Sequence, residues 1–312
     1  MHWDHRVGRR LKLRELNILL AVAQAGSMAK AAKGLAISQP AVSRAIADME
    51  HTLGVPLFDR SPQGIEPTQY GRALLKRGVA VFDELKQGVQ EIEFLSNPDA
   101  GELHIASSTG LSEGIVLAVI NRLSQQYPRV VFHVVPFGLL AQYEELRERR
   151  VELGFARLSG PVSEEDMNAE VLFEDPLAVV VGMQNPWVRR RKIKLAELVN
   201  EPWTWPAPGT AFDSLVVEAF RASGLEPPRA AVYADAYGLR IKLAESGPFL
   251  AVVPASVLKF SVKHTSIKML PVELPTTRSQ IGIITLKNRT LSPLAQLFIG
   301  CAREIAPLAR KK

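Results

Sequence analysis

The chain has 312 residues, of which 47% are hydrophobic and 22% charged, a composition that argues against a disordered chain and leaves room for more than one domain. No segment approaches the roughly 18 consecutive apolar residues of a membrane-spanning helix. The net charge of +6 is confined to residues 1–78, with 12 Lys and Arg against 6 Asp and Glu, whereas residues 79–312 hold 26 of each. Such a segment attracts phosphate backbones through counterion release, although a basic face that only aids solubility would carry the same charge.

Secretion, disulfide bonding and metal binding find no support in the sequence. The segment Met1–Arg14 is polar and basic and lacks the apolar core of a signal peptide, so we expect a cytoplasmic protein. Cys301 is the only cysteine, which excludes an internal disulfide and a cysteine-rich zinc site. The six histidines are scattered and form no metal-binding spacing. We therefore expect no metal, no cofactor and no membrane partner.

The N-terminal quarter has the pattern of three short helices. Leucines at helical spacing predict an amphipathic helix over Leu13–Ala25, which ends at a glycine. Ser27 is a good N-cap for an alanine-rich helix over Met28–Leu35. After a short turn, Ser38 can cap a third helix. Small side chains on the second helix would let the third approach closely, as in a helix-turn-helix.

The third helix has one apolar and one polar face. The apolar stripe consists of Val42, Ile46 and Met49. Pro40 is tolerated in the first turn, where backbone N–H groups lack intrahelical partners. The polar side chains near its N-terminal end, Gln39, Ser43 and Arg44, are of the kind that reads base edges or phosphates. An ordinary helical hairpin with a solvated polar face is the alternative.

A Pro/Gly turn follows between two short apolar pieces. Leu57-Phe58 and Ile65 flank this turn, and the pattern predicts a two-stranded wing. Arg60 lies beside the turn, where it could reach a phosphate or a minor groove, or could be a solvated surface arginine.

These features together closely resemble the winged helix-turn-helix of LysR-type transcriptional regulators. The matching motifs are Gly26-Ser27, Ala31-Ala32, Ser38-Gln39-Pro40-Ala41-Val42-Ser43, Met49-Glu50, Leu53-Gly54, Leu57-Phe58-x-Arg60 and Thr68-x-x-Gly71. Met28 and Met49 depart from the family's usual aromatic and leucine but remain apolar. The predicted DNA-binding residues are Ser27, Ser38, Gln39, Pro40, Ser43, Arg44 and Arg60. The resemblance implies a winged helix-turn-helix domain over residues 11–68.

A long helix connects this domain to the rest of the chain. Thr68 can cap it, and Asn97-Pro98 ends it, which predicts a linker over residues 69–97. Apolar residues spaced by sevens favour a coiled-coil seam, although the helix could instead pack on its own domain. LysR-type linker helices pair two subunits, so we expect a homodimer or homotetramer. The predicted dimerisation residues are Leu75, Phe82, Leu85, Val89 and Ile92.

Residues 100–312 alternate between strand-like and helical segments. This order predicts an α/β fold with largely parallel sheets covered by helices. The region resembles the effector-binding domain of LysR-type regulators, which is akin to periplasmic solute-binding proteins. The resemblance implies two lobes, about 100–172 plus 273–312 and about 173–272, with a ligand cleft between them.

Ligands in such sheets bind beyond the carboxyl ends of the strands. This rule selects the predicted effector-binding residues Ser108, Thr109, Gly110, Arg157, Trp205, Pro206, Thr210 and Tyr237. Hydroxyls and N–H groups at Ser108 and Thr109 suit a carboxylate or a sugar, and Arg157 could supply a cation. Each also has a structural alternative: a helix cap, an ion pair with a nearby carboxylate, or, for Trp205, a place in the core.

The sequence thus predicts a LysR-type DNA-binding transcriptional regulator that senses an organic or aromatic acid, or a sugar, and changes promoter binding or bending. Double-stranded DNA and the effector are the expected partners, and RNA polymerase is a further candidate. We expect no catalytic residues, because nucleophile elbows, phosphate-binding loops and metal clusters are absent from the sequence. The alternatives are a constitutive DNA-binding protein without a ligand and an enzyme fused to a DNA-binding domain.

Overall fold

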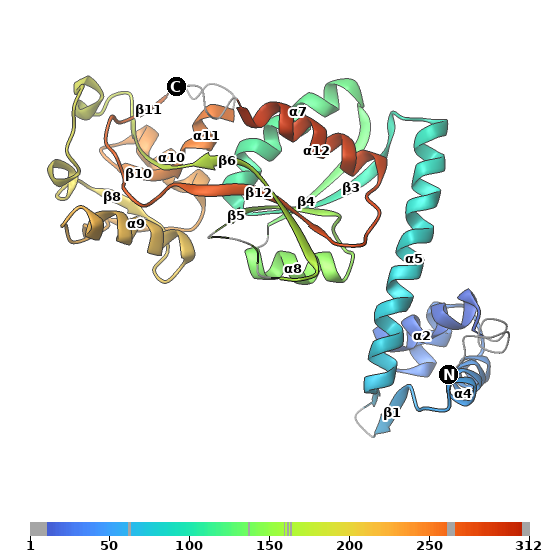
Figure 1. Ribbon diagram of the computed structural model, residues 1–312. Helices are drawn as coiled ribbons and strands as arrows, with labels where there is room; N and C mark the ends of the chain where they lie inside the picture. The colour runs from blue at the N-terminus through green and yellow to red at the C-terminus, as the bar shows by residue number, and fades with distance from the viewer. Residues whose placement is uncertain are drawn as a thin grey trace. The chain divides into compact units, whose positions relative to one another are not determined.

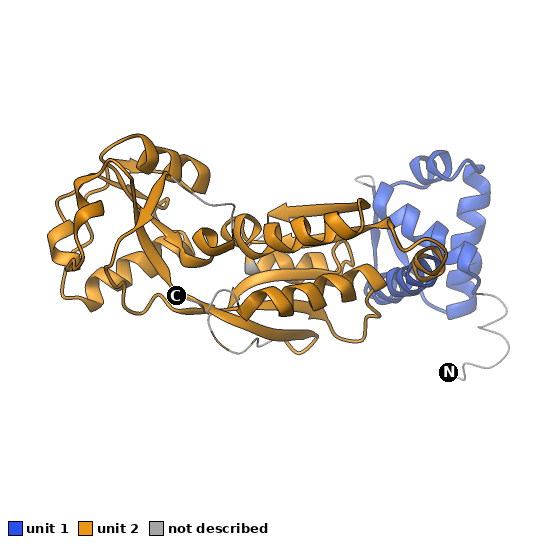
Figure 2. Ribbon diagram, turned by 90° about the horizontal axis from the view of Figure 1, so that it is seen from above, with its two compact units in different colours: residues 1–89 blue, residues 90–312 orange. Residues whose placement is uncertain are grey.

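A computed structural model describes residues 11–61, 64–136, 138–158, 160, 162, 164–260 and 266–307, with the side chains of residues 60, 61 and 139 left out. The chain forms two compact units, residues 1–89 and 90–312 (Figure 2). Within the described residues, no helix is long and apolar enough to cross a membrane.

The first unit is built on three helices, α2 (Leu13–Ala25), α3 (Met28–Gly34) and α4 (Gln39–Leu53). Gly26 ends α2 with a φ of 63°, a left-handed conformation that glycine adopts without steric cost. The stripe predicted on α4 is buried, since Val42, Ile46 and Met49 are at most 1% exposed. These side chains pack with those of α2 and α3 into one apolar core.

A two-stranded antiparallel wing follows, formed by β1 (Phe58–Ser61) and β2 (Gly64–Pro67). The family motifs have clear structural roles here. The Glu50 carboxylate accepts hydrogen bonds from the N–H groups of Leu57 and Phe58, at 2.7 and 3.3 Å. This holds the start of the wing against α4.

The long helix α5 (Gln69–Ser96) begins directly after the wing. The Thr68 hydroxyl accepts a hydrogen bond from the Gly71 N–H at 3.0 Å and donates one to the Pro56 carbonyl at 2.7 Å. A Cβ at residue 71 would lie 2.0 Å from the Leu57 carbonyl oxygen. Only glycine therefore allows the helix this close to the wing, which accounts for the Thr68-x-x-Gly71 motif.

The second unit has two lobes, each with a five-stranded mixed sheet. The first sheet has the order β4-β3-β5-β12-β6. Its strands are β3 (Ala100–Ser107), β4 (Arg129–Pro136), β5 (Leu153–Leu158), β6 (Met167–Asp175) and β12 (Ser279–Leu286). Helices α7 (Leu117–Gln126) and α12 (Pro293–Ile305) cover one face, and α8 (Leu139–Arg147) covers the other (Figure 1).

The second sheet has the order β11-β7-β10-β8-β9. Its strands are β7 (Leu177–Gly182), β8 (Trp203–Trp205), β9 (Val232–Tyr233), β10 (Leu250–Pro254) and β11 (Ile267–Met269). The helices of this lobe are α9 (Ala211–Ala222), α10 (Tyr237–Ser246) and α11 (Ala255–Phe260). Two short turns of 3-10 helix, η2 (Pro186–Arg189) and η3 (Leu195–Leu198), complete it.

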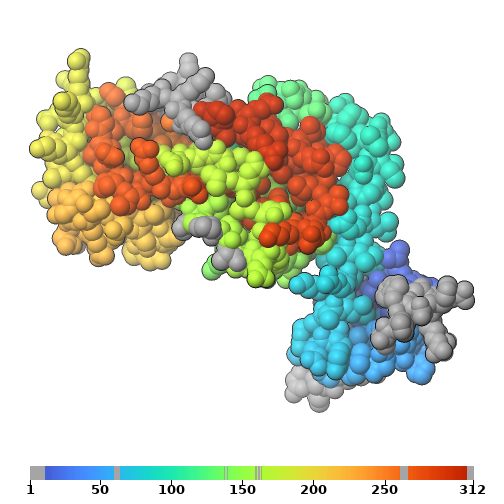
Figure 3. Space-filling view, viewed as in Figure 1, coloured from blue at the N-terminus to red at the C-terminus, as the bar shows by residue number. Residues whose placement is uncertain are grey.

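The sheets are less parallel than the alternation of elements indicated. In the first lobe β12 runs antiparallel to both β5 and β6, and in the second β7 runs antiparallel to both β10 and β11. The physical reason is the connection between lobes: the chain crosses outward from β6 to β7 and returns from β11 to β12. Figure 3 shows the consequence in the first lobe, where atoms of β6 lie beside those of β12 although far apart in sequence.

The helical segment after β3 is not continuous. It consists of α6 (Thr109–Leu111), a π-helical segment η1 (Ser112–Val116) and α7. Gly114 has non-helical angles, φ −104° and ψ −107°. It packs on the second lobe, where a Cβ at residue 114 would lie 3.4 Å from the Ser256 hydroxyl oxygen.

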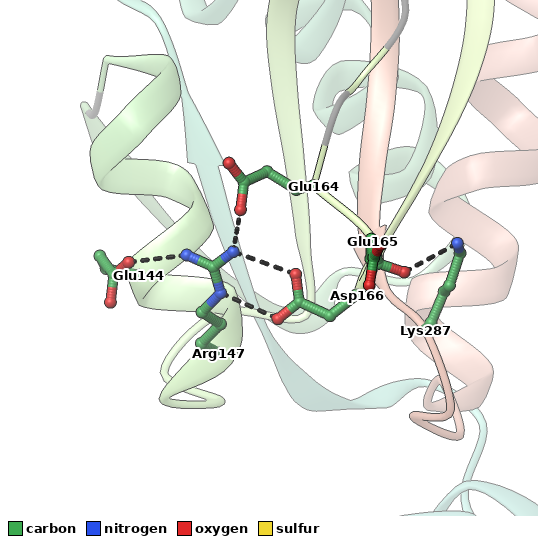
Figure 4. Close-up of polar contacts among 6 residues, drawn as sticks. All are labelled: Glu144, Arg147, Glu164, Glu165, Asp166 and Lys287. Carbon is green, nitrogen blue, oxygen red and sulfur yellow. Dashed lines mark hydrogen bonds and ion pairs between the residues drawn. The ribbon is translucent and has the colours of Figure 1, made fainter.

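An ionic network fixes the segment that enters β6 (Figure 4). Arg147, in the last turn of α8, holds the Asp166 carboxylate through two hydrogen bonds of 2.9 and 3.0 Å and also bonds Glu144 and Glu164. The Lys287 ammonium donates to the Glu165 carbonyl at 2.8 Å. Three carboxylates around Arg147 raise its pKa above the usual value. Arg147 thus ties α8 to the segment that enters β6, and Lys287 ties the same segment to the end of β12.

Candidate functional site

The N-terminal end of α4 exposes the residues predicted to read DNA. Ser38 is the N-cap, and its hydroxyl accepts a hydrogen bond from the Ala41 N–H at 3.3 Å. Gln39, Pro40 and Arg44 are exposed. A helix that buries one stripe and projects an amide and a guanidinium from its first turns can enter a major groove.

Two serines of the predicted set are less available. The Ser43 hydroxyl donates to the Met28 sulfur at 3.1 Å, so it links α4 to α3. Ser27 is the N-cap of α3 and is half-buried, and its side chain makes no capping hydrogen bond. Ser43 therefore lies between α4 and α3, and Ser27 lies in the turn between α2 and α3.

Basic side chains outside the predicted set share a groove with α4. Lys12 and Arg14, at the start of α2, line a groove of about 590 Å³ together with Arg44 and His51. The basic N-terminal segment was the sequence signal for this surface, but only the packing of α2 against α4 brings Lys12 and Arg14 beside Arg44. The wing residue Arg60 lies in β1, and its side chain is outside the described part of the chain.

Helix α5 carries an exposed apolar seam along its second half. Leu85, Val89 and Ile92 follow the spacing i, i+4, i+7 and are 49–66% exposed. Leu75 instead packs against the core of the first unit, and Phe82 is half-buried. Of the five predicted dimerisation residues, three therefore lie on one open face of the helix, and that face continues to Leu95.

A cleft of about 540 Å³ lies between the two lobes of the second unit. It opens where β3, β4 and β5 end, as the rule for parallel strands requires. The predicted effector residues that line it are Ser108, Thr109, Gly110, Arg157, Pro206, Thr210 and Tyr237. The structure thus brings together, from both lobes, seven residues that were chosen one by one from strand ends.

Trp205 does not line the cleft. It is buried, contacts Trp203 and Phe220 edge-on or tilted, and donates its indole N–H to the Asp213 carboxylate at 2.8 Å. Its short strand β8 lies inside the sheet, between β10 and β9, so the side chain faces the helix-covered core. The aromatic side chains that line the cleft are those of Tyr237 and Phe212.

Two other cleft residues have structural tasks. The Thr210 hydroxyl caps α9, accepting from the Asp213 N–H at 3.1 Å and donating to the Ala207 carbonyl at 2.8 Å. Gly110 brings the lobes together, because a Cβ there would lie 3.1 Å from Pro254 and 3.2 Å from the Tyr237 ring. Any side chain at residue 110 would therefore press the lobes apart at the back of the cleft.

Arg157 is engaged by a buried carboxylate. It donates to the Asp175 carboxylate at 3.0 Å and to the Asp175 carbonyl at 2.7 Å. The same carboxylate accepts the N–H and the hydroxyl of Ser256, at 2.9 and 2.7 Å. Asp175 thus joins Arg157 of the first lobe to Ser256 of the second, and the charge of Arg157 is already compensated.

A second cleft arginine, Arg240, was not predicted. It is 1% exposed, and its guanidinium lies over the rings of Tyr237 and Phe212, 4.4 and 5.1 Å from their centroids. One nitrogen donates to the Val252 carbonyl at 3.3 Å, whereas Nε is buried without a hydrogen-bond partner. Burial lowers the pKa of Arg240 and raises that of Tyr237 to about 12. Within the described residues, Arg240 makes no ion pair.

The signal for Arg240 was present in the sequence. It lies three residues after Tyr237 on α10, and residues at this spacing share one face of a helix. Because α10 begins at the cleft residue Tyr237, its fourth residue, Arg240, faces the same cleft.

Residues 96–307 match the family "LysR substrate binding domain", and residues 13–72 match "Bacterial regulatory helix-turn-helix protein, lysR family". The chain belongs to the LysR family of transcription regulators. This regulator therefore combines a DNA-binding winged helix-turn-helix with an effector-binding domain, and its family consists of regulators rather than enzymes.

Individual relatives match this regulator over nearly its whole length. The HTH-type transcriptional regulator GbpR of Azospirillum brasilense is 26% identical over 297 residues, covering 94% of this chain and 86% of GbpR. The uncharacterized HTH-type transcriptional regulator YybE of Bacillus subtilis is 30% identical over 284 residues, covering 91% of this chain and 95% of YybE. A crystal structure of full-length CbnR complexed with its target DNA is 25% identical, covers 95% of this chain and 100% of CbnR, and superposes with a TM-score of 0.54.

Proposed function

We propose that this regulator senses a small organic acid in the cleft between its lobes, and that binding of the acid changes how it binds or bends its promoter. Arg240 is the observation that carries the proposal. A buried guanidinium is costly to desolvate, and an anion in the cleft would recover that cost through charge-assisted hydrogen bonds.

Other cleft residues favour the same class of ligand. Ser108 is half-buried and its side chain makes no capping hydrogen bond, so its hydroxyl is available to a ligand oxygen. Thr109 beside it is exposed at the cleft. The rings of Tyr237 and Phe212 offer an apolar wall to the carbon skeleton. An aromatic or branched acid would use all three features, whereas a neutral sugar would supply no counter-ion to Arg240.

The test is a binding measurement on the full-length protein with acids and their neutral counterparts. We expect a small carboxylic acid to bind and its amide or alcohol not to bind. A true ligand at 100 times its Kd stabilises the folded state by about 2.7 kcal/mol, which thermal unfolding detects. Binding of sugars in preference to acids would overturn the acid assignment.

Substitution of Arg240 locates the site. Hydrogen bonds to charged groups contribute about 1.5–3 kcal/mol, so Arg240→Gln should weaken acid binding roughly 10- to 100-fold. The matched control is Arg221→Gln, because Arg221 is an exposed arginine on α9 that does not line the cleft. Equal acid affinity in the two variants, with both folded by circular dichroism, would contradict the proposal.

We further infer that the regulator self-associates through α5 as a homodimer or homotetramer. The exposed seam of Leu85, Val89 and Ile92 supports this, since an open apolar stripe on a long helix is favourably covered by a second copy. Paired subunits would present two winged helix-turn-helix domains to two DNA half-sites. The effector would then act by changing the spacing of the two DNA-binding domains. RNA polymerase would be the next partner at the promoter.

The existence of the cleft favours this function over a constitutive DNA-binding protein. A ligand-free architectural protein has no need of a cavity of about 540 Å³ with a buried cation at its edge. Operator affinity and DNA bending, measured with and without the acid, decide between them. If the acid binds and neither quantity changes, the switch is refuted while the binding site stands.

A further inference from the structure

Three side chains of types that commonly bind metal ions lie close together on the first lobe, outside the cleft. Glu102 and His104 are two residues apart on β3, so they project from the same face of the sheet. His133 on the parallel strand β4 lies directly opposite His104 in the register of the sheet. The intervening Leu103 points to the other face and is fully buried in the core.

The distances within this cluster suit one cation. The Nε2 atoms of His104 and His133 lie 3.8 and 3.6 Å from Glu102 Oε2, and the three potential ligand atoms all lie within 4.8 Å of one another. Tetrahedral zinc with bonds of about 2.0–2.1 Å separates its ligand atoms by about 3.3–3.4 Å. To share one ion, the two histidine–carboxylate distances must shorten by about 0.2–0.5 Å, and the separation of the two imidazole nitrogens, which is at most 4.8 Å, by up to about 1.5 Å.

One of the potential ligand atoms is a buried imidazole nitrogen. His133 Nε2 has no hydrogen-bond partner among the described residues, and it lies 3.6 Å from Glu102 Oε2. Buried polar atoms in folded proteins are nearly always satisfied. The His104 and His133 side chains are still 38 and 42% exposed, so an ion can reach the cluster from solvent.

Both imidazoles must turn to share an ion. Their rings are stacked, with centroids 4.2 Å apart and planes 6° from parallel, so their lone pairs lie in separate planes. Two ligands meet a tetrahedral ion at an angle of about 109°, which nearly parallel stacked rings cannot do. Rotation about the Cβ–Cγ bond is a soft torsion with broad minima, and turning both partly exposed rings by several tens of degrees would direct their nitrogens to a common point beside Glu102.

We propose that Glu102, His104 and His133 form a binding site for a borderline divalent cation such as Zn²⁺. Two imidazoles and one carboxylate favour Zn²⁺, Ni²⁺ or Cu²⁺ over Mg²⁺ and Ca²⁺, which prefer all-oxygen ligand sets. Three protein ligands leave a fourth position for water or another ligand. The site stands apart from the cleft residues and does not depend on the acid proposed as effector.

Calorimetric titration of the chelator-treated full-length protein with ZnCl₂ tests the site. We expect one Zn²⁺ to bind per chain, and His133→Asn or Glu102→Gln to weaken that binding at least about tenfold. His51→Asn is the matched control, because His51 is an exposed histidine on α4 outside the cluster. Circular dichroism checks that each variant is folded. If His133→Asn does not fold, Glu102→Gln still tests the site, because residue 102 is exposed.

Two results would overturn the proposal. The first is no heat of binding with the unaltered protein. The second is binding that both cluster variants leave unchanged and His51→Asn removes, which would move the ion elsewhere. As a separate readout, Co²⁺ bound to two imidazoles and a carboxylate should give visible absorption bands of a low-coordinate site, and Glu102→Gln should change them.

Discussion

The Asp175 carboxylate joins the two lobes of the second unit. Its removal tests how much this carboxylate contributes to the stability of that unit. Asp175→Ala deletes three hydrogen bonds, two from Ser256 and one from Arg157. It also leaves Arg157, whose side chain is only 16% exposed, without its carboxylate partner. Arg157 then keeps its hydrogen bond to the carbonyl of residue 175.

The expected loss follows from burial. Breaking a buried ion pair by removing one partner costs about 3–5 kcal/mol, because the other charge stays desolvated. For a unit of this size each kcal/mol lowers Tm by about 2–4 °C, so Asp175→Ala should lower the Tm of the second unit by roughly 6–20 °C. The exposed pair of Glu304 with Arg122 is the matched control, and Glu304→Ala should cost less than about 1 kcal/mol.

Thermal unfolding of four variants separates the charge effect from simple loss of contacts. We expect Arg157→Met to recover part of the loss in the Asp175→Ala background, since it removes the uncompensated cation. If the double variant instead loses the sum of the two single losses, the cost does not come from a stranded charge. If Asp175→Ala costs no more than Glu304→Ala, Asp175 does not hold the lobes together.

Three further predictions concern the DNA-reading helix, the linker and the cleft. Arg44→Ala should lower operator affinity by about 1–3 kcal/mol and relax preference at one base pair, measured on single-substitution operators; a uniform loss would make Arg44 a phosphate contact. Ile92→Glu should shift sedimentation toward the monomer, while Lys86→Glu, an exposed change on another side of α5, should not; equal behaviour would argue against the seam. Burial raises the pKa of Tyr237 from 10.0 to about 12, so its neutral form is favoured in the folded state. The corresponding stability is present below pH 10 and is lost as the pH rises to about 12, by roughly 3 kcal/mol at most. Tyr237→Phe should lack this part of the alkaline loss in pH-dependent denaturation, and an identical profile would refute the assignment.

The winged helix-turn-helix could be predicted from the sequence because its determinants are local. Helix ends in the first unit are set by Gly26 and Ser38, and the wing is held by Glu50, seven and eight residues before its partners. Thr68 and Gly71 act within one turn of helix. Interactions over such short separations leave regular spacings that a single sequence displays.

The alternating strands and helices likewise predicted an α/β fold, and the family resemblance implied two lobes with a cleft between them. They could not show which cleft residues are free. Arg157 and Arg240 are both arginines beside the cleft, yet one is neutralised by Asp175 and the other is not. Nor could the sequence place His133 opposite His104, because strand register is set by pairing across the sheet.

The sequence alone therefore determined the local motifs, the class of each domain and the family. Only the tertiary structure decided that Trp205 belongs to the core, that Asp175 joins the lobes, and that Arg240 is the buried cation at the cleft. The reason is physical: an ionic side chain's role depends on which partner reaches it, and these partners lie up to 81 residues away along the chain. Residues so far apart in the chain show no regular spacing, so their pairing can be identified only in the folded structure.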